Sequence, residues 1–380
     1  MTSDGDPLLI IGAGAAGYGL LRAFRRRNRD APVSLMTDDD GIVYARAELS
    51  RALATGKAAR ELILASAAEM AERYRVRLIC RTRAHAIDRA NRIVLTEDGP
   101  RAYDRLVLAS GAEPLRPSIR GSGGHRLLTL STLDEYRYLE RELAGRDRVA
   151  LLGGTLAACE TALHLVAAGK TVVLFETASR LLGGRLPALS ARRMAGLLEE
   201  AGVRLRLESG LARIDQEPDA LALTTLSGQQ FSSDVVLAMC GMRPRAALAG
   251  AAGLDVGRGI RVDAAFRTAD PHIFAVGECA EVGGHPITLP EDVDASVNVL
   301  AGVLCGTSEA RMRWRPRMRR VRVGDCPLVL CEPPRLVGEW QETATPRGVR
   351  AIFFDQAGRP RGFVLIGNRA EEAEHWFSRL

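Results

Sequence analysis

The sequence predicts an α/β protein built from two similar β-α-β units, one inserted into the other, followed by a small α+β domain. Glycine-rich turns occur about 140 residues apart, and each follows an apolar strand and precedes an alanine-rich helix. Each unit also closes on a similar strand and turn, residues 105–111 and 234–241, which suggests two copies of one plan. Residues 307–380 instead alternate short strands and end in a helix, a pattern typical of a separate α+β domain.

The first turn, residues 12–17, is a complete G-x-G-x-x-G motif after the strand 8–11. Its first glycine permits the tight turn, its second lets the backbone approach a pyrophosphate at the helix N-terminus, and its third lets helix and strand pack closely. A second strand, residues 33–37, ends at Asp38, where a carboxylate would accept hydrogen bonds from the ribose of an adenine dinucleotide. The order of strand, turn, helix and acid therefore predicts a Rossmann-like dinucleotide site, against the alternative of a structural turn; its glycines are Gly12, Gly14 and Gly17.

The second turn has the same surroundings but a different centre. It follows the strand 148–152 and begins with Gly153 and Gly154, but Thr155 stands at the middle glycine position. A β-branched side chain where the backbone should touch phosphate raises a steric and a conformational objection. The next strand still ends in an acid, Glu176, at the ribose position. We expect the second unit to keep the β-α-β fold, whereas the sequence does not decide whether it still binds a dinucleotide.

Composition restricts the function classes. The 380 residues are 47% hydrophobic and 26% charged, with a net charge of +6 carried almost entirely by arginine. Nucleic-acid binding is not expected, because no helix-turn-helix, aromatic platform or zinc spacing accompanies the charge. No 18-residue apolar run and no basic leader occur, so we expect no membrane span and a cytoplasmic protein. Seven scattered cysteines without C-x-x-C, and scattered histidines, predict reduced thiols and no metal site.

Arginines gather between residues 311 and 322, mostly at alternate positions, so several would face one side of an extended segment. This run is either a solvated strand face or a docking surface for an acidic protein partner. Elsewhere, the pattern predicts helices over residues 59–74 and 292–305, and a strand over 273–280 that returns to the first unit. His164, on the apolar helix after the second turn, is expected to be a satisfied core residue.

With these features, the chain resembles the FAD-dependent pyridine nucleotide–disulfide oxidoreductase superfamily over essentially its whole length. Within it, the chain is most similar to rubredoxin–NAD(+) reductases and flavorubredoxin reductases, and more distantly to ferredoxin reductases of oxygenase systems. The segments that carry the resemblance are Ala109-Ser110-Gly111, Ala275–Ala280, Tyr44–Ser50 and, most specifically, Cys326–Pro334.

The resemblance implies a flavoprotein with a first domain of residues 1–115 and 240–306 that binds FAD. It also implies an NAD(H)-binding domain of residues 116–239 and a C-terminal domain of residues 307–380. Electrons would pass from NADH through FAD to an acidic carrier such as a rubredoxin or ferredoxin. The FAD-binding residues implied are Gly12, Gly14, Gly17, Asp38, Ser110, Gly111, Gly277 and Glu278; those for NADH are Gly153, Gly154, Thr155 and Glu176. Arg46 would lie near the isoalloxazine and Glu160 near the nicotinamide, as the catalytic pair.

Four departures from the family pattern leave alternatives open. Thr155 interrupts the NADH turn, Glu278 replaces the usual aspartate, and Ala47 replaces a proline. The helix expected to face the flavin also begins with Glu291, Asp292 and Asp294. These acids either cap the helix and meet its dipole favourably, or they belong to a retuned flavin site. Three hypotheses remain: an NADH-dependent reductase of an iron carrier, an FAD-dependent oxidase or dehydrogenase of a small molecule with a degenerate NADH site, and an FAD-stabilised scaffold.

Overall fold

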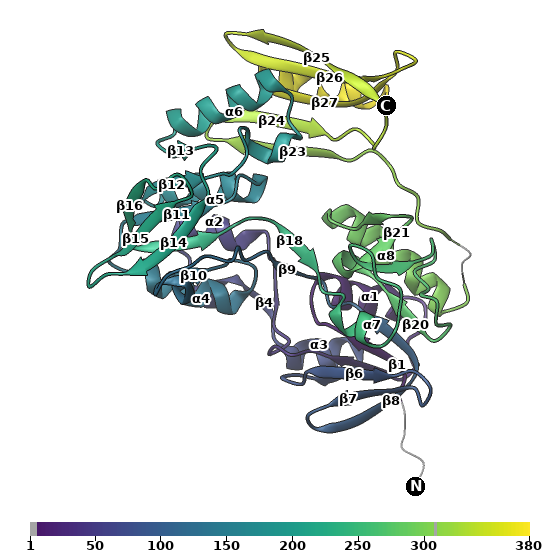
Figure 1. Ribbon diagram of the computed structural model, residues 1–380. Helices are drawn as coiled ribbons and strands as arrows, with labels where there is room; N and C mark the ends of the chain where they lie inside the picture. Colours follow the sequence, from purple (N-terminus) through teal and green to yellow (C-terminus); the bar gives the residue numbers. More distant parts are fainter. Residues whose placement is uncertain (1–5, 308–309) are drawn as a thin grey trace. The chain divides into compact units, whose positions relative to one another are not determined.

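The computed structural model describes residues 6–307 and 310–380, and the chain folds into two compact units (Figure 1). The first unit takes the segments up to Ala45, Ile63–Glu113 and Met242–Arg313. The second takes Arg46–Leu62, Pro114–Gly241 and Trp314–Leu380. Residues 46–62, placed in the first domain from sequence, thus group with the second unit, and so does most of the C-terminal domain. The finer division into three domains remains a prediction.

A mainly parallel sheet forms the centre of the first unit. Its strand order is β5-β2-β1-β8-β7-β6, and β20 adds to the other side of β8 in parallel. The strands are β1 (Asp6–Ile11), β2 (Val33–Met36), β5 (Arg77–Ile79), β6 (Ala84–Asp88), β7 (Ile93–Thr96), β8 (Gly99–Leu108) and β20 (Ile273–Ala275). Because β1, β2, β8 and β20 run in parallel, their carboxyl ends meet at one edge.

Helix α1 (Ala15–Arg25) and helix α8 (Pro290–Leu304) pack against each other beside this sheet. A Cβ atom on Gly19 of α1 would lie 3.5 Å from the Val297 side chain of α8, an ordinary van der Waals distance, so the two helices are close at this point. The remaining elements are β3 (Val43–Tyr44), β4 (Ile63–Ala65), α3 (Ala67–Tyr74), β9 (Ala112–Pro114), β18 (Met242–Pro244), α7 (Ala247–Ala251), β19 (Ile260–Val262), η4 (Gly277–Cys279), β21 (Ala280–Val282) and β22 (His285–Pro286).

The second unit contains its own parallel sheet with the strand order β10-β17-β11-β12-β13. The strands are β10 (Leu127–Leu128), β11 (Arg148–Leu152), β12 (Thr171–Phe175), β13 (Arg204–Arg206) and β17 (Val235–Ala238). The antiparallel strands β14 (Leu211–Gln216), β15 (Leu221–Thr225) and β16 (Gln230–Ser233) form a separate ribbon. Its helical elements are α2 (Glu48–Thr55), η1 (Ala59–Leu62), η2 (Gly124–Arg126), α4 (Leu133–Leu143), α5 (Leu156–Ala167), η3 (Leu181–Gly184) and α6 (Ala188–Glu200). Helix α2 packs on α5, the helix that follows the second glycine turn.

The C-terminal residues form an antiparallel sheet with the order β23-β24-β27-β26-β25. Its strands are β23 (Met318–Val323), β24 (Cys326–Cys331), β25 (Gly338–Thr345), β26 (Gly348–Asp355) and β27 (Pro360–Gly367). One face packs under η5 (Asn368–Glu372) and α9 (Ala373–Phe377) around Cys331, Phe363 and Leu365. Alternate residues on the other face, such as Leu328 and Ile366, are buried as well.

Helix α6 packs against this second face, contacting β23, β25, β26 and β27 (Figure 1). The carboxylate of Glu342 on β25 accepts hydrogen bonds from the backbone N–H groups of Leu189 and Ser190, both at 2.9 Å. It also accepts one from the Ser190 hydroxyl at 3.0 Å. Because Pro187 at the N-cap provides no side-chain bond, Glu342 caps α6 from the C-terminal sheet.

The predicted fold class is therefore confirmed: two Rossmann-like units and a small C-terminal α+β domain. The helix predicted over residues 59–74 is wrong, since η1, β4 and α3 divide it. Ser66 ends the strand and caps α3, with its hydroxyl and the Glu69 carboxylate forming a reciprocal capping box. Among the described residues, no helix is long and apolar enough to cross a membrane.

Candidate functional site

The first glycine turn lies at the carboxyl edge of the first unit's sheet, between β1 and α1. Gly12 has φ +112°, a conformation that disfavours other residues, and a Cβ atom there would collide with the carbonyl oxygen of Ala109. Its N–H donates to the carbonyl of Met36 at 2.7 Å, which anchors the turn to β2. A Cβ atom on Gly17 would in turn overlap the carbonyl of Gly12. Both glycines thus hold the helix close to the sheet.

Gly14 has a different role, because it borders open space. It is the N-cap of α1 with φ −78°, provides no side-chain cap, and a Cβ atom on it would meet nothing within 4 Å. Unsatisfied N–H groups at a helix N-terminus attract anions. The turn therefore leaves room for a phosphate group at the start of α1, and the residues present fit the pyrophosphate of a dinucleotide.

Asp38 follows β2 and is exposed. Its neighbour Asp39 is committed to the local turn, since it accepts hydrogen bonds from the Thr37 hydroxyl at 2.8 Å and the Gly41 N–H at 2.9 Å. Within the described parts of the chain, Asp38 has no hydrogen-bond partner. Of the two acids, Asp38 is thus the one available to ribose hydroxyls.

The returning strand β20 brings a second glycine segment to the same edge. A Cβ atom on Gly277 would collide with the Ala16 side chain at the start of α1, so this glycine packs directly against the first turn. A Cβ atom on Gly111, after β8, would lie 4.0 Å from a carboxylate oxygen of Glu278. The Ser110 hydroxyl donates to the Arg245 carbonyl at 2.8 Å and so joins the loop after β8 to the segment after β18. The first unit thus gathers the predicted FAD-binding residues other than Arg46 at one edge.

The acids at the start of α8 divide by burial. Glu291 and Asp294 are exposed, whereas Asp292 is only 4% exposed in the first helical turn. None of them is the N-cap, which is Leu289 and makes no side-chain cap bond. These acids therefore do not act from the N-cap position, but Glu291 and Asp292 lie in the first turn, where an acid meets the helix dipole favourably.

The second glycine turn repeats this geometry between β11 and α5. Gly153 has φ +105°, and a Cβ atom there would lie 2.7 Å from the Met239 carbonyl oxygen. Its N–H donates to the Phe175 carbonyl at 2.8 Å, as Gly12 does in the first unit. Gly154 lies against the acid that ends β12, because its N–H donates to the Glu176 carboxylate.

Thr155 is accommodated in this turn without backbone strain. It is the N-cap of α5 with φ −69° and ψ 162°, extended values open to any residue, so the expected conformational objection is wrong. Its hydroxyl accepts a hydrogen bond from the Ala158 N–H at 3.1 Å and donates to the Met239 carbonyl at 3.0 Å. Thr155 therefore caps the helix but occupies one of the N–H groups that a phosphate would use.

Glu176 is fixed at the turn by several donors. Besides Gly154, it accepts hydrogen bonds from the Ala178 N–H at 2.8 Å and the Thr177 hydroxyl at 3.1 Å. Its carboxylate thus stands at the position where an acid meets the adenosine ribose in this kind of unit. The second unit therefore joins four of the predicted residues, Gly153, Gly154, Thr155 and Glu176, in one turn.

The two residues expected to be catalytic both belong to the second unit. Glu160 lies on α5, where burial raises the pKa of its carboxyl, while the guanidinium groups of Arg319 and then Arg51 lower it. Arg46 is half-buried just before α2. Its expected place near the flavin remains a prediction, because the FAD turn lies in the other unit.

Sequence reasoning missed the charged neighbours of Glu160. Arg51 follows the recognised Tyr44–Ser50 segment directly, which could have drawn attention to it. Arg319 comes from β23, far away in sequence, and no local signal identifies it. His164 was expected to be a satisfied core residue, and its buried Nδ1 has no protein partner among the described residues.

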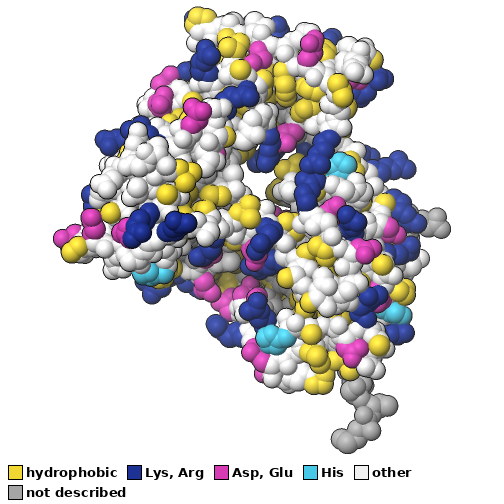
Figure 2. Space-filling view, viewed as in Figure 1, with side chains coloured by type: hydrophobic (Ala, Val, Ile, Leu, Met, Phe, Trp, Pro, Cys, Tyr) yellow, Lys and Arg dark blue, Asp and Glu magenta, His cyan; other side chains and the backbone are white. Residues whose placement is uncertain are grey.

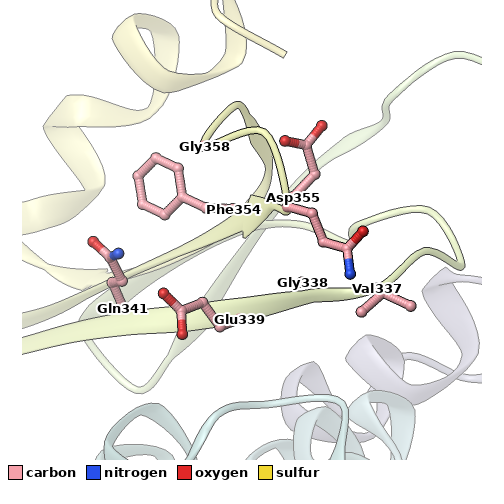
Figure 3. A pocket seen from close by; sticks show the side chains of 8 residues that line it. Val337, Gly338, Glu339, Gln341, Phe354, Asp355 and Gly358 are labelled. Atoms are coloured by element: carbon pink, nitrogen blue, oxygen red, sulfur yellow. The ribbon is translucent and has the colours of Figure 1, made fainter.

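A pocket in the C-terminal sheet is lined by residues of β25, of β26 and of the turn after β26 (Figure 3). Asp355 beside it organises the β26–β27 turn, accepting from the Arg359 N–H and from the Arg361 side chain, both at 2.9 Å. These bonds lower the pKa of Asp355 to about 2. The lining residues are Val337, Gly338, Glu339, Gln341, Phe354, Asp355, Gln356 and Gly358, which include no group suited to redox chemistry. Across the described residues, no cluster of three or more His, Cys, Asp or Glu side chains could hold a metal ion.

Comparisons with known proteins agree over the whole chain. Residues 6–298 match the family described as pyridine nucleotide-disulphide oxidoreductase, and residues 316–380 match the rubredoxin binding C-terminal domain. The nitric oxide reductase FlRd-NAD(+) reductase of Vibrio vulnificus (strain CMCP6) is 34% identical over 368 residues, covering 97% of this chain and 96% of that protein. The rubredoxin-NAD(+) reductase of Alcanivorax borkumensis is 33% identical over 369 residues, with 96% of each chain covered.

Solved structures show the same fold. The ferredoxin reductase for the CYP199A2 system of Rhodopseudomonas palustris has a TM-score of 0.86 at 26% identity, covering 98% of this chain and 93% of that one. The covalent putidaredoxin reductase–putidaredoxin complex has a TM-score of 0.87 at 24% identity, covering 100% and 94% of the two chains.

Proposed function

Because the chain belongs to the pyridine nucleotide-disulphide oxidoreductase family, it is an FAD-dependent NAD(P)H oxidoreductase, and we propose how its residues divide the work. It passes electrons from NADH through FAD to a small iron carrier of the rubredoxin or ferredoxin type. The observation that carries this function is the combination of two complete strand, turn, helix and acid units with a rubredoxin-binding domain in one chain.

The first unit is proposed to hold FAD. The open N-terminus of α1 at Gly14 would receive the pyrophosphate, and the exposed Asp38 would accept from the adenosine ribose. Glu278 beside Gly111 would meet the ribityl chain. When bound, FAD accepts a hydride from NADH and releases the electrons singly to the carrier. Helix α8, with buried Asp292 in its first turn, would direct its N-terminus and its dipole at the flavin.

The second unit is proposed to hold NADH. The turn of Gly153, Gly154 and Thr155 would bring the N-terminus of α5 to the pyrophosphate. Glu176 would meet the adenosine ribose, and Glu160 the nicotinamide. The Glu176 carboxylate, fixed by backbone donors, would repel a 2′-phosphate, which favours NADH over NADPH. Arg46 is proposed to contact the flavin edge.

The carrier is proposed to bind through the C-terminal domain. The arginine run offers positive charge, but part of it is already paired: Arg320 bonds Glu374 at 2.7 Å, and Arg322 lies 3.9 Å from Asp325. Over the C-terminal sheet, single basic and acidic side chains lie among apolar ones (Figure 2). The exposed Arg315 is therefore a better candidate for steering an acidic carrier.

We also propose a cytoplasmic location. All seven cysteines are free thiols, as expected in a reducing compartment.

An anaerobic titration with NADH, followed by addition of oxidised rubredoxin or ferredoxin, tests the proposed function. The visible flavin absorbance should bleach with NADH and return as the carrier is reduced. If NADH bleaches the flavin but neither carrier restores it, the carrier assignment is wrong. If NADH leaves the flavin oxidised, the reductase proposal is wrong, and the oxidase or dehydrogenase reading, with buried Asp292 near the ring, takes its place.

A further inference from the structure

Glu160 on α5 is a half-buried carboxylate that depends on charges from other elements. Within the described parts of the chain, it accepts no hydrogen bond. Burial raises the pKa of its carboxyl, and the positive charges of Arg319 and Arg51 lower it. Its ionised form is therefore stabilised by two guanidinium groups that the fold brings to α5 from β23 and α2.

Arg319 faces α5 because of the alternation along β23. Residues 319, 321 and 323 share one side of the strand, and Val323 on that side is only 3% exposed. Strand β23 packs against both α5 and α6. Arg320, on the opposite side, is exposed and bonds Glu374. Arg319 is half-buried on the inner side.

The two arginines differ in how freely they act on Glu160. Arg51 shares its charge with Glu48, one turn away on α2, at 3.2 Å. Among the described residues, Arg319 has no acidic side chain in ion-pair contact. The positive charge of Arg319 is therefore less neutralised than that of Arg51. Arg319 lies in the segment that matches the rubredoxin binding C-terminal domain.

We propose that Arg319, on the side of β23 that packs against α5, is a positioning residue whose positive charge acts on the Glu160 carboxylate at the nicotinamide site. The C-terminal domain would then supply a charge to NADH oxidation as well as a surface to the carrier. This inference rests on the proposed function, which assigns Glu160 to the nicotinamide.

The other titratable groups around Glu160 do not duplicate this role. Burial lowers the pKa of His164, one turn further along α5; Arg51 lowers it too, and Glu48 raises it. His164 is thus neutral at physiological pH. Burial raises the pKa of the adjacent Cys159 thiol to about 12, so it stays protonated. A pH dependence that disappears with Glu160 can therefore be assigned to that carboxyl.

The test is the pH profile of flavin reduction by NADH, measured by anaerobic stopped flow without any carrier. The Glu160→Gln variant identifies the limb of the profile that belongs to Glu160. In Arg319→Gln, this limb should move to higher pH, because loss of a positive charge raises the pKa of a nearby carboxyl. At a pH on the limb, the rate should change about twofold to tenfold, the effect of a partly screened charge.

Two controls separate charge from structure. Arg319→Lys should restore the wild-type limb, because it keeps the charge. Arg320→Gln removes the same charge from the exposed side of the same strand and should leave the limb in place. In the Glu160→Gln background, Arg319→Gln should have no further effect on pH dependence. Should Arg319→Gln fold poorly, Arg319→Met preserves the side-chain length and should move the limb in the same direction.

An unmoved limb in Arg319→Gln or Arg319→Met, or an equal displacement in Arg320→Gln, would overturn the inference while the enzyme still works. Absence of flavin reduction in the wild type at every pH would instead overturn the proposed function, and this inference with it.

Discussion

Replacing Thr155 by glycine should strengthen NADH binding. The Thr155 hydroxyl occupies the Ala158 N–H at 3.1 Å, one of the donors at the N-terminus of α5. Glycine frees this donor for the pyrophosphate, and a hydrogen bond to a charged group contributes roughly 1.5–3 kcal/mol. The expected gain in affinity is therefore about 10-fold or more. Loss of the bond to the Met239 carbonyl weakens the fold equally with and without nucleotide, and loss of the cap costs only a few tenths of a kcal/mol with glycine.

The dissociation constant comes from the NADH concentration dependence of flavin reduction in anaerobic stopped flow. Two further variants separate the contributions of the side chain. Thr155→Ser keeps the capping hydroxyl and removes only the methyl group, so it should bind NADH as the wild type does. Thr155→Ala frees the donor while keeping a Cβ atom, and it should recover most of the gain. FAD content should be unchanged in all three, since the FAD turn lies in the first unit.

Equal NADH affinity in the wild type and in the glycine and alanine variants would refute the reasoning, because the Ala158 N–H would then not face the pyrophosphate. An equal gain in Thr155→Ser, Thr155→Ala and Thr155→Gly would instead assign the effect to the bulk of the methyl group, which all three variants remove.

Three further predictions follow from contacts in the two units. Gly17→Ala should abolish FAD incorporation, because its Cβ atom would overlap the Gly12 carbonyl; a normal ratio of flavin to protein absorbance would contradict this. Glu176→Gln should narrow the preference for NADH over NADPH by removing the charge at the ribose, measured as the ratio of flavin reduction rates, and an unchanged ratio would place the acid elsewhere. Glu342→Ala should lower the free energy of unfolding by about 1–2 kcal/mol through loss of the α6 cap, measured by urea denaturation with NADH-dependent flavin reduction as the control; an unchanged midpoint would show that the cap contributes nothing.

Local patterns predicted the cofactor turns well. The strands before both turns, and the acids Asp38 and Glu176, lie where the alternation of strand, glycine motif and helix places them. This succeeds because a β-α-β unit is set by short-range constraints: a positive φ at Gly12, close packing at Gly17 and an acid at the end of the next strand.

Interpretation failed where side-chain hydrogen bonds or distant segments decide the result. Thr155 was expected to disrupt the second glycine turn, but threonine is a good N-cap, and its hydroxyl accepts a hydrogen bond from the Ala158 N–H of α5. The helix expected over residues 59–74 breaks because the Ser66 and Glu69 capping box starts a new helix there. Arg319 and Glu342 act on helices more than 140 residues earlier in the chain, and no local periodicity encodes such contacts.

The position of α6 over the C-terminal sheet bears on how carrier specificity could be exchanged between related reductases. A graft of residues 316–380 alone would leave the sheet face around Leu328 and Ile366 against a foreign helix, and would separate Glu342 from the helix it caps. The transplantable module therefore includes α6 (Ala188–Glu200) together with the terminal strands, although more than 100 residues of sequence lie between them.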